Sequence, residues 1–133
     1  MAARASSSFK IKGWDEAPYA EIEGGGKLTK ASVTAEFSGD IAGESSVEWL
    51  MCYRPDQTAD FVGLQRIVGT LGGRSGSFVL AHPAGTFDGT AARCEVSVVE
   101  GSGTGELSGL RGRGQFAAPH GGEPSIQLDY ELD

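Results

Sequence analysis

Glycine is the feature that most restricts the fold of this chain, because 21 of its 133 residues are glycine. That share is more than twice the usual one of about 7%. Glycine in a helix interior costs about 1 kcal/mol relative to alanine, so this composition argues against a helical bundle. The glycines follow no collagen-like period and are interleaved with valine, isoleucine and phenylalanine. The sequence therefore predicts an all-β domain with many turns.

Alternation of apolar and polar residues locates the strands. Within the segment Leu28–Phe37, apolar residues occupy every second position from Ala31 to Phe37, as in a strand with one buried face. Turn-forming residues separate further runs of this kind. About eight short strands indicate one closed antiparallel β-barrel over residues 1–133, with residues 1–8 as a flexible N-terminal segment. The predicted strands are Phe9–Ile11, Leu28–Phe37, Ser45–Tyr53, Phe61–Leu71, Arg74–His82, Ala91–Val99, Gly105–Phe116 and Ile126–Leu132.

Charge and cysteine content exclude several classes of partner. Eighteen acidic residues against eleven basic ones give a net charge of −7. Nucleic-acid binders neutralise phosphates with a basic face, and anionic membranes attract basic surfaces, so we expect neither as a partner. Residues 1–8 lack the apolar run of a signal peptide, so we expect a cytoplasmic protein. In that compartment Cys52 and Cys94 are expected to be reduced, packed thiols.

The Gly72-Gly73 pair predicts a tight hairpin. A two-residue turn of the primed type needs positive φ at both positions, which glycine adopts at little cost. This turn fixes which residues of the two flanking strands lie opposite each other. The pairs that it predicts are Ile67–Phe78, Gln65–Leu80 and Gly63–His82.

The Arg54–Asp60 loop predicts a second hairpin, whose register depends on the centre of the loop. With the centre at Gln57, the pairs are Glu48–Arg66, Trp49–Gln65 and Tyr53–Phe61. Glu48 and Arg66 are then expected to form a cross-strand ion pair. If that pair were buried, it would instead orient a bound carbonyl or carboxylate.

The two hairpins together predict a barrel interior. One face of the three strands is apolar with a few polar tips, which is typical of small-molecule pockets and also of ordinary cores. The candidate proton-transfer residues are His82 and Tyr53, because an imidazole can move protons near neutral pH without a cofactor. The candidate ligand-binding residues are Trp49, Met51, Gln65, Phe78 and Leu80, together with Glu48 and Arg66. The opposite face is expected to pack against a second subunit of a homo-oligomer or against the N-terminal segment, through Leu50, Val62, Leu64 and Val68.

Motifs for cofactors and metals are weak in this chain. Gly101–Gly105 lacks the spacing of a dinucleotide fingerprint. His82 and His120 are the two histidines and lie far apart in the sequence, without metal-ligand spacing. We therefore expect no cofactor and no metal, and we expect His120 to be a solvated loop residue.

Three segments resemble a known family. Phe61–Arg66, Gly69–Phe78 and Gly101–Leu107 are similar to a bacterial family catalogued only as a domain of unknown function and grouped with the allene-oxide-cyclase-like β-barrels. The resemblance implies a barrel that binds apolar molecules in its interior. In the cyclases such a barrel steers ring closure without a metal or an organic cofactor. Where the family is expected to carry glutamate this chain has Gln65, which hydrogen-bonds but cannot take up a proton, so the resemblance implies a weakened acid–base pair with His82.

Three functions stay open at this point. The first is a cofactor-independent isomerase or cyclase that acts on a small apolar metabolite. The second is a carrier barrel that binds such a molecule without chemistry. The third is a structural or oligomerising barrel with a filled interior, which a structure without a cavity larger than a water molecule would favour.

Overall fold

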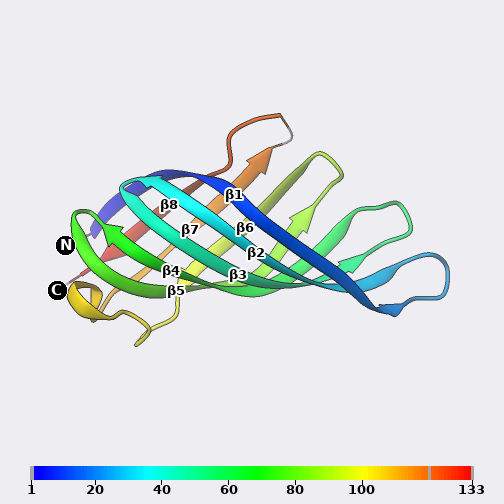
Figure 1. The fold of residues 1–133 in the computed structure, drawn as a ribbon, viewed down its shortest axis with the longest axis horizontal. Coiled ribbons are helices and arrows are strands. Elements are labelled where there is room, and N and C mark those ends of the chain that lie inside the picture. Colours follow the sequence, from blue (N-terminus) through cyan, green and yellow to red (C-terminus); the bar gives the residue numbers. More distant parts are fainter. Residues whose placement is uncertain (1, 120, 133) are drawn as a thin grey trace.

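The computed structural model describes residues 2–119 and 121–132, and within them eight strands form a closed barrel with one short 3₁₀ helix. Each strand pairs antiparallel with the next, and β8 pairs with β1 to close the barrel (Figure 1). The predicted all-β, closed antiparallel barrel is thereby confirmed. No helix in the described residues is long and apolar enough to cross a membrane. The elements are β1 (Ala2–Glu21), β2 (Lys27–Gly39), β3 (Ile41–Tyr53), β4 (Ala59–Leu71), β5 (Arg74–Phe87), β6 (Ala91–Val98), η1 (Gly105–Leu107), β7 (Arg111–Pro119) and β8 (Ser125–Glu131).

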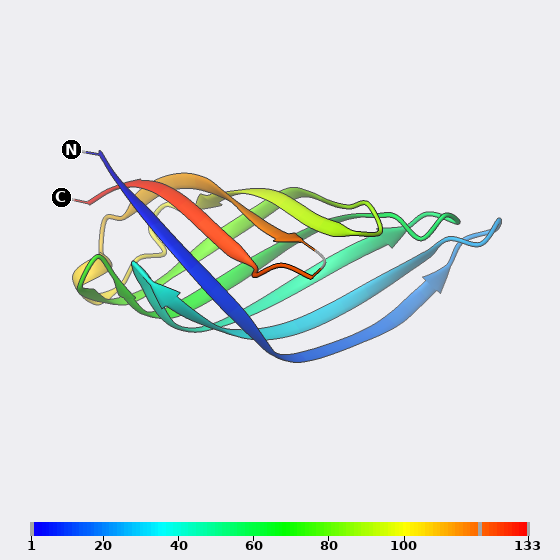
Figure 2. The ribbon, with the colours of Figure 1, turned by 90° about the horizontal axis from the view of Figure 1, so that it is seen from above.

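Strand β1 closes the barrel over only part of its length. Residues 2–8 pair with β8, and residues 7–21 pair with β2. The predicted flexible segment is therefore wrong for residues 2–8, because Ala5 is buried and the Ser7 hydroxyl accepts a hydrogen bond from the Ile41 backbone N–H at 2.6 Å. Met1 lies outside the described residues. Beyond Ser8, β1 leaves β8 and continues with β2 alone, so the barrel opens at that end (Figure 2).

The predicted hairpin at Gly72 and Gly73 is confirmed. The two glycines have φ of +59° and +86°, and all three predicted pairs across β4 and β5 are present. Strand β5 nevertheless runs past its predicted end at His82. Pro83, which has no N–H to donate, lies in a bulge, and the strand continues to Phe87.

The predicted register between β3 and β4 is wrong by two residues. Trp49 lies opposite Gly63 rather than Gln65, and Glu48 lies opposite Leu64 rather than Arg66. The cause is local, because the Asp56 carboxylate accepts hydrogen bonds from the Thr58 N–H at 3.0 Å and the Thr58 hydroxyl at 2.6 Å, which tightens the turn around Asp56. A shift of two residues keeps every side chain on its predicted face.

The two faces of β3 and β4 therefore lie as predicted. The inner face is buried or half-buried and forms the core, whereas the outer face is exposed. Residues 2–8 pair with β8 and do not cover the outer face, so the packing of that segment on it is wrong. A neighbouring subunit stays a prediction for this face. Its exposed apolar side chains are Leu50, Val62, Leu64 and Val68, between 46% and 58% exposed.

Other predictions for the outer face need correction. Glu48 and Arg66 form no ion pair with each other, because Glu48 instead lies 3.8 Å from the Lys30 ammonium and accepts a hydrogen bond from Ser32 at 2.9 Å. Both cysteines are free thiols, and Cys94 is buried as expected. Cys52 is exposed and is not packed, because it alternates onto the outer face.

One end of the barrel is plugged by the segment between β6 and β7. Gly105 to Phe116 was predicted as a single strand, but its first part forms η1, which buries Leu107. Thr104, just before η1, and Glu106, in η1, bond to the start of β5. The Ser77 N–H donates to the Thr104 hydroxyl at 3.0 Å, and the Ser75 N–H donates to the Glu106 carboxylate at 3.0 Å. Two of the segments that carry the family resemblance, Gly69–Phe78 and Gly101–Leu107, thus contact each other, the first in the β4–β5 hairpin and the second in the plug.

Gly76 lets the plug approach β5. A Cβ at this position would collide with the Thr104 carbonyl oxygen, whereas a Cβ at Gly73 in the same hairpin would meet nothing within 4 Å. We therefore expect Gly76→Ala to lower the free energy of unfolding by about 1–3 kcal/mol through overpacking. Gly73→Ala is the matched control and should lose only about 1 kcal/mol from its positive φ. Urea denaturation measures both, and equal losses would contradict the assigned role of Gly76.

Candidate functional site

A row of three residues crosses the inner wall at the open half of the barrel. Trp49 in β3, Gly63 in β4 and His82 in β5 lie opposite one another in register. Because Gly63 has no side chain, the indole of Trp49 lies across β4, and a Cβ at Gly63 would stand 2.6 Å from its Cδ1 atom. This arrangement brings the indole of Trp49 to the imidazole of His82.

A chain of buried hydrogen bonds continues from this row. The Trp49 Nε1–H donates to His82 Nδ1 at 3.1 Å. His82 Nε2 lies 3.1 Å from Gln65 Oε1, and Gln65 Nε2 donates to the Ser45 hydroxyl at 3.2 Å. Gln65, Ser45 and His82 are buried, with His82 only 1% exposed, whereas Trp49 is half-buried. The chain therefore runs from the rim of the barrel into its core.

Aromatic rings surround the Trp49 end of this chain. The ring of Phe61 lies 5.3 Å from that of Trp49, and the ring of Phe116 lies 6.1 Å from it at an interplanar angle of 27°. Phe116 also lies 5.3 Å from the His82 ring. Such centroid distances are those of favourable aromatic pairs. The indole thus occupies an aromatic slot, nearly parallel to the ring of Phe116 and tilted by 56° from the ring of Phe61.

A small void lies beside this slot. Its volume is about 20 Å³, enough for about one water molecule. The void lies where β1 leaves β8, and Ile11 at its edge is 40% exposed. Its lining residues are Phe9, Ile11, Val33, Ala35, Phe37, Val47, Trp49, Gln65, His82, Phe116 and Ile126.

Burial keeps His82 uncharged at neutral pH. Removal from water lowers the pKa of His82 to about 4, because the charged imidazolium loses its hydration. The hydrogen bonds agree with a neutral ring, since a protonated Nδ1 would point its hydrogen at the Trp49 N–H. His82 is therefore a hydrogen-bonding group at pH 7 and only a weak base.

A second polar cluster lies nearer to the open end. The Glu16 carboxylate accepts hydrogen bonds from Trp14 Nε1 at 3.0 Å and from the Thr29 hydroxyl at 2.7 Å. Burial alone would raise the pKa of Glu16, but its hydrogen bonds to Thr29, Tyr53 and Trp14 and the charge of Lys27 lower it overall. Burial and then Glu16 raise the pKa of Tyr53 to about 12. Tyr53 therefore keeps its proton at any ordinary pH.

The predicted site residues fall into three groups. Trp49, Gln65 and His82 meet in the hydrogen-bonded chain. Tyr53 and Met51 lie together on β3, where the Tyr53 hydroxyl oxygen is 3.8 Å from the Met51 sulfur, and neither residue lines the void. The remaining four do not line the void: Phe78 and Leu80 are fully buried core residues, and Glu48 and Arg66 lie exposed on the outer face.

Sequence reasoning missed Phe116 and Glu16. Phe116 contacts Phe9, Trp49, Phe61 and His82, but glycines interrupt the predicted strand Gly105–Phe116 and hide which of its faces is buried. Alternation from Gly112 through Gly114 to Phe116 was the available signal. Glu16 was missed because the opening strand was predicted only around Phe9 and Ile11, whereas β1 extends to Glu21.

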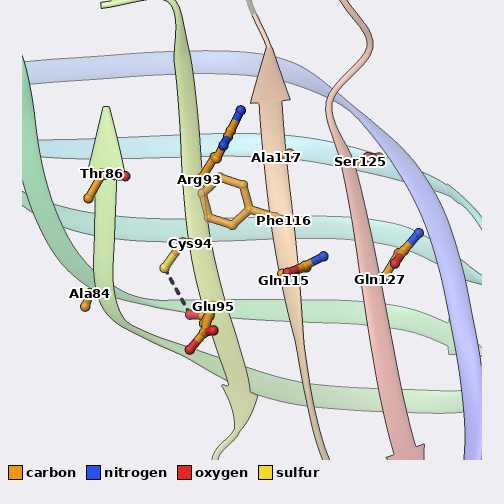
Figure 3. A pocket seen from close by; sticks show the side chains of 10 residues that line it. All are labelled: Ala84, Thr86, Arg93, Cys94, Glu95, Gln115, Phe116, Ala117, Ser125 and Gln127. Atoms are coloured by element: carbon orange, nitrogen blue, oxygen red, sulfur yellow. Dashed lines mark hydrogen bonds between the residues drawn. The ribbon is translucent and has the colours of Figure 1, made fainter. Parts of the chain in front are cut away.

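A wider hollow of about 590 Å³ lies on the outer face of β5 to β8 (Figure 3). The side chains around it are mostly polar and exposed, such as Arg93, Glu95 and Gln115. Its two buried lining residues, Cys94 and Phe116, belong to the barrel core. The hollow is larger than the interior void but has no buried polar group aimed into it, so the interior is the better candidate site.

Within residues 2–119 and 121–132, no group of three or more His, Cys, Asp or Glu side chains is arranged to hold a metal ion. The predicted loop residue His120 lies outside these ranges. The groups available at the interior site are thus an imidazole, an amide, a hydroxyl and an indole. They can hold a neutral molecule by hydrogen bonds and aromatic contacts.

Comparisons with known proteins give the family of this chain. A search of curated proteins found no match. The crystal structure of a protein of unknown function from the DUF3224 family of Shewanella oneidensis MR-1 is similar over 100% of this chain and 99% of that chain, with 29% sequence identity and a TM-score of 0.84. The family model described as "Protein of unknown function (DUF3224)" matches residues 5–130. The chain therefore belongs to the DUF3224 family.

Proposed function

We propose that this protein binds a small, mostly apolar molecule inside the open half of the barrel, in the space that the Trp49 indole fills in this structure. The observation that carries the proposal is the hydrogen bond between a half-buried indole and a buried imidazole in an aromatic slot. Ligand pockets are typically apolar with a few fixed polar groups, and this slot has that composition. The resemblance to allene-oxide-cyclase-like barrels also favours an apolar ligand in the interior.

The void of about 20 Å³ is too small for a ligand, so binding requires a side chain to move. Trp49 is the side chain best placed to do so, because it is half-buried and packs on Trp14, which is 48% exposed. Moving the Trp49 side chain out of the slot would break one hydrogen bond, which contributes about 1 kcal/mol, and several aromatic contacts, which contribute about 0.5–1.5 kcal/mol each. A ligand that restores these contacts offsets that cost.

Isomerisation or ring closure in the same space is an extension of this proposal. His82 would act as a neutral hydrogen-bonding group and Tyr53 as a protonated phenol, since their pKa values of about 4 and about 12 make both poor at exchanging protons at pH 7. Catalysis would then come mainly from folding the substrate into one conformation. Conversion of a bound molecule into a product would support this catalytic extension.

A barrel with a filled interior and a structural role is the second candidate. The small void favours it, because the core then needs no ligand to complete its packing. The two candidates differ in whether the interior admits a small molecule at all.

Native mass spectrometry after incubation with a metabolite extract tests the proposal. The wild type is expected to retain a small molecule, and Ala35→Leu, which fills the void from its lining, is expected to lose it. Thr34→Leu is the matched control, because Thr34 points outward and is exposed. Retention by Ala35→Leu would place any bound molecule away from the void and the Trp49 slot beside it, and a bare wild-type protein would favour the filled barrel.

A further inference from the structure

The hydrogen-bonded chain at the site has a fixed direction. An indole N–H can only donate, so His82 Nδ1 must be the acceptor. A neutral imidazole carries its one hydrogen on the other nitrogen, so Nε2–H donates to Gln65 Oε1. The Gln65 amide then turns its NH₂ group to the Ser45 hydroxyl. Trp49 thereby sets the roles of all three groups behind it.

This direction defines what His82 offers to a molecule that replaces Trp49. The free group would be the Nδ1 lone pair, which needs a hydrogen-bond donor. An acceptor such as an ether or ketone oxygen would fit only if His82 changed tautomer, the Gln65 amide turned over and the Ser45 hydroxyl reversed. Leaving the buried lone pair without a donor costs more than the hydrogen bond itself contributes.

The walls of the slot define the shape of the molecule. The indole is itself planar, and it lies at 27° to the ring of Phe116 and at 56° to the ring of Phe61, so the space that it vacates is flat with one nearly parallel wall. No cation faces this space from its lining, which favours a neutral molecule over an anion. The occupant should therefore be planar and uncharged.

We propose that the ligand of the interior site is a neutral planar aromatic molecule with a hydrogen-bond donor, of the phenol or indole class, whose N–H or O–H replaces that of Trp49 on His82 Nδ1. This inference rests on the proposed function. It adds that the site selects donors over acceptors, and that Gln65 acts as a positioning residue because its Oε1 accepts from His82 Nε2–H and so stabilises the tautomer with its lone pair on Nδ1.

Indole and benzofuran form the matched probe pair, because they share one shape and differ in an N–H against an oxygen. Calorimetric titration of the wild-type protein is expected to show indole binding tighter by on the order of tenfold or more. In Gln65→Leu the His82 tautomer is no longer fixed, so the ratio of the two affinities should fall towards one. The wild-type ratio alone decides the proposal if Gln65→Leu does not fold.

The outcomes separate this inference from the function on which it rests. Equal wild-type affinities for indole and benzofuran would overturn the donor preference and leave an apolar binding barrel. Binding by Trp49→Ala but not by the wild type would overturn the displacement of Trp49, and with it the proposed function, while the indole-to-benzofuran ratio of the variant would still report on His82. An unchanged ratio in folded Gln65→Leu would overturn the positioning role of Gln65.

Discussion

Replacing Phe78 with alanine is expected to lower the free energy of unfolding by about 3–5 kcal/mol. Phe78 is 1% exposed, lies opposite the buried Ile67, and follows the part of β5 that bonds to the plug. Its truncation would leave a cavity in a closed part of the barrel that the neighbouring strands cannot easily fill. Denaturation in guanidinium chloride with the slope held common to both proteins measures the loss.

The same experiment separates the core from the ligand site. Sequence reasoning placed Phe78 among the ligand-binding residues, whereas the structure places it in the core. Val62→Ala on the outer face, where Val62 is 46% exposed, is the control and should change stability by less than about 0.5 kcal/mol. A loss below about 1 kcal/mol for Phe78→Ala would contradict the packed core around this residue.

Acidification from pH 7 to pH 4 is expected to remove about 3 kcal/mol of stability through His82 alone. The pKa of His82 is lowered from 6.5 to about 4 in the folded protein. Below pH 6.5 His82 binds a proton in the unfolded chain, whereas in the folded chain it binds that proton only near pH 4. The contribution of the buried neutral ring is therefore fully present above pH 6.5 and is lost as the pH falls from 6.5 to 4.

A matched variant isolates this effect from the carboxylates, which also titrate in acid. His82→Gln keeps a neutral group that can accept from Trp49 and donate to Gln65. Chemical denaturation of both proteins between pH 4 and pH 7.5 gives the difference in their stabilities at each pH, and His120 is common to both. The difference should change by about 3 kcal/mol over this range. A difference independent of pH would show that His82 is not held uncharged by burial.

Much of the fold follows from local patterns in the sequence. The alternation in β2 to β5 sorted inner from outer residues correctly, and the Gly72-Gly73 turn gave the register of β4 and β5. The register of β3 and β4 failed because it depended on the side chain of Asp56, which closes its turn earlier than a symmetric loop would. Because the predicted register differed from the observed one by two residues, each side chain still lies on its predicted face.

The site depended on that register and was only partly predictable. Gly63 was placed beside His82, but Trp49 was placed opposite Gln65, so the contact of the indole with the imidazole across Gly63 was not foreseen. The periodicity of apolar residues could not predict the volume of the void either. That volume depends on how side chains as distant in sequence as Phe9 and Phe116 pack together. The length of β1 was underestimated as well, so Glu16, which lies in the part of β1 that shows no clear alternation, was not predicted as a site residue.

The most direct test of the account is whether Trp49 leaves His82 when a ligand binds. The chain has two tryptophans, so the ¹⁵N-labelled protein shows two indole N–H signals, and Trp14→Phe assigns them. On saturation with unlabelled indole, the account predicts that the Trp49 signal moves to the position of an indole without its imidazole partner, while the Trp14 signal, bonded to Glu16, moves much less. A Trp49 signal that stays in place at saturating indole would contradict the account.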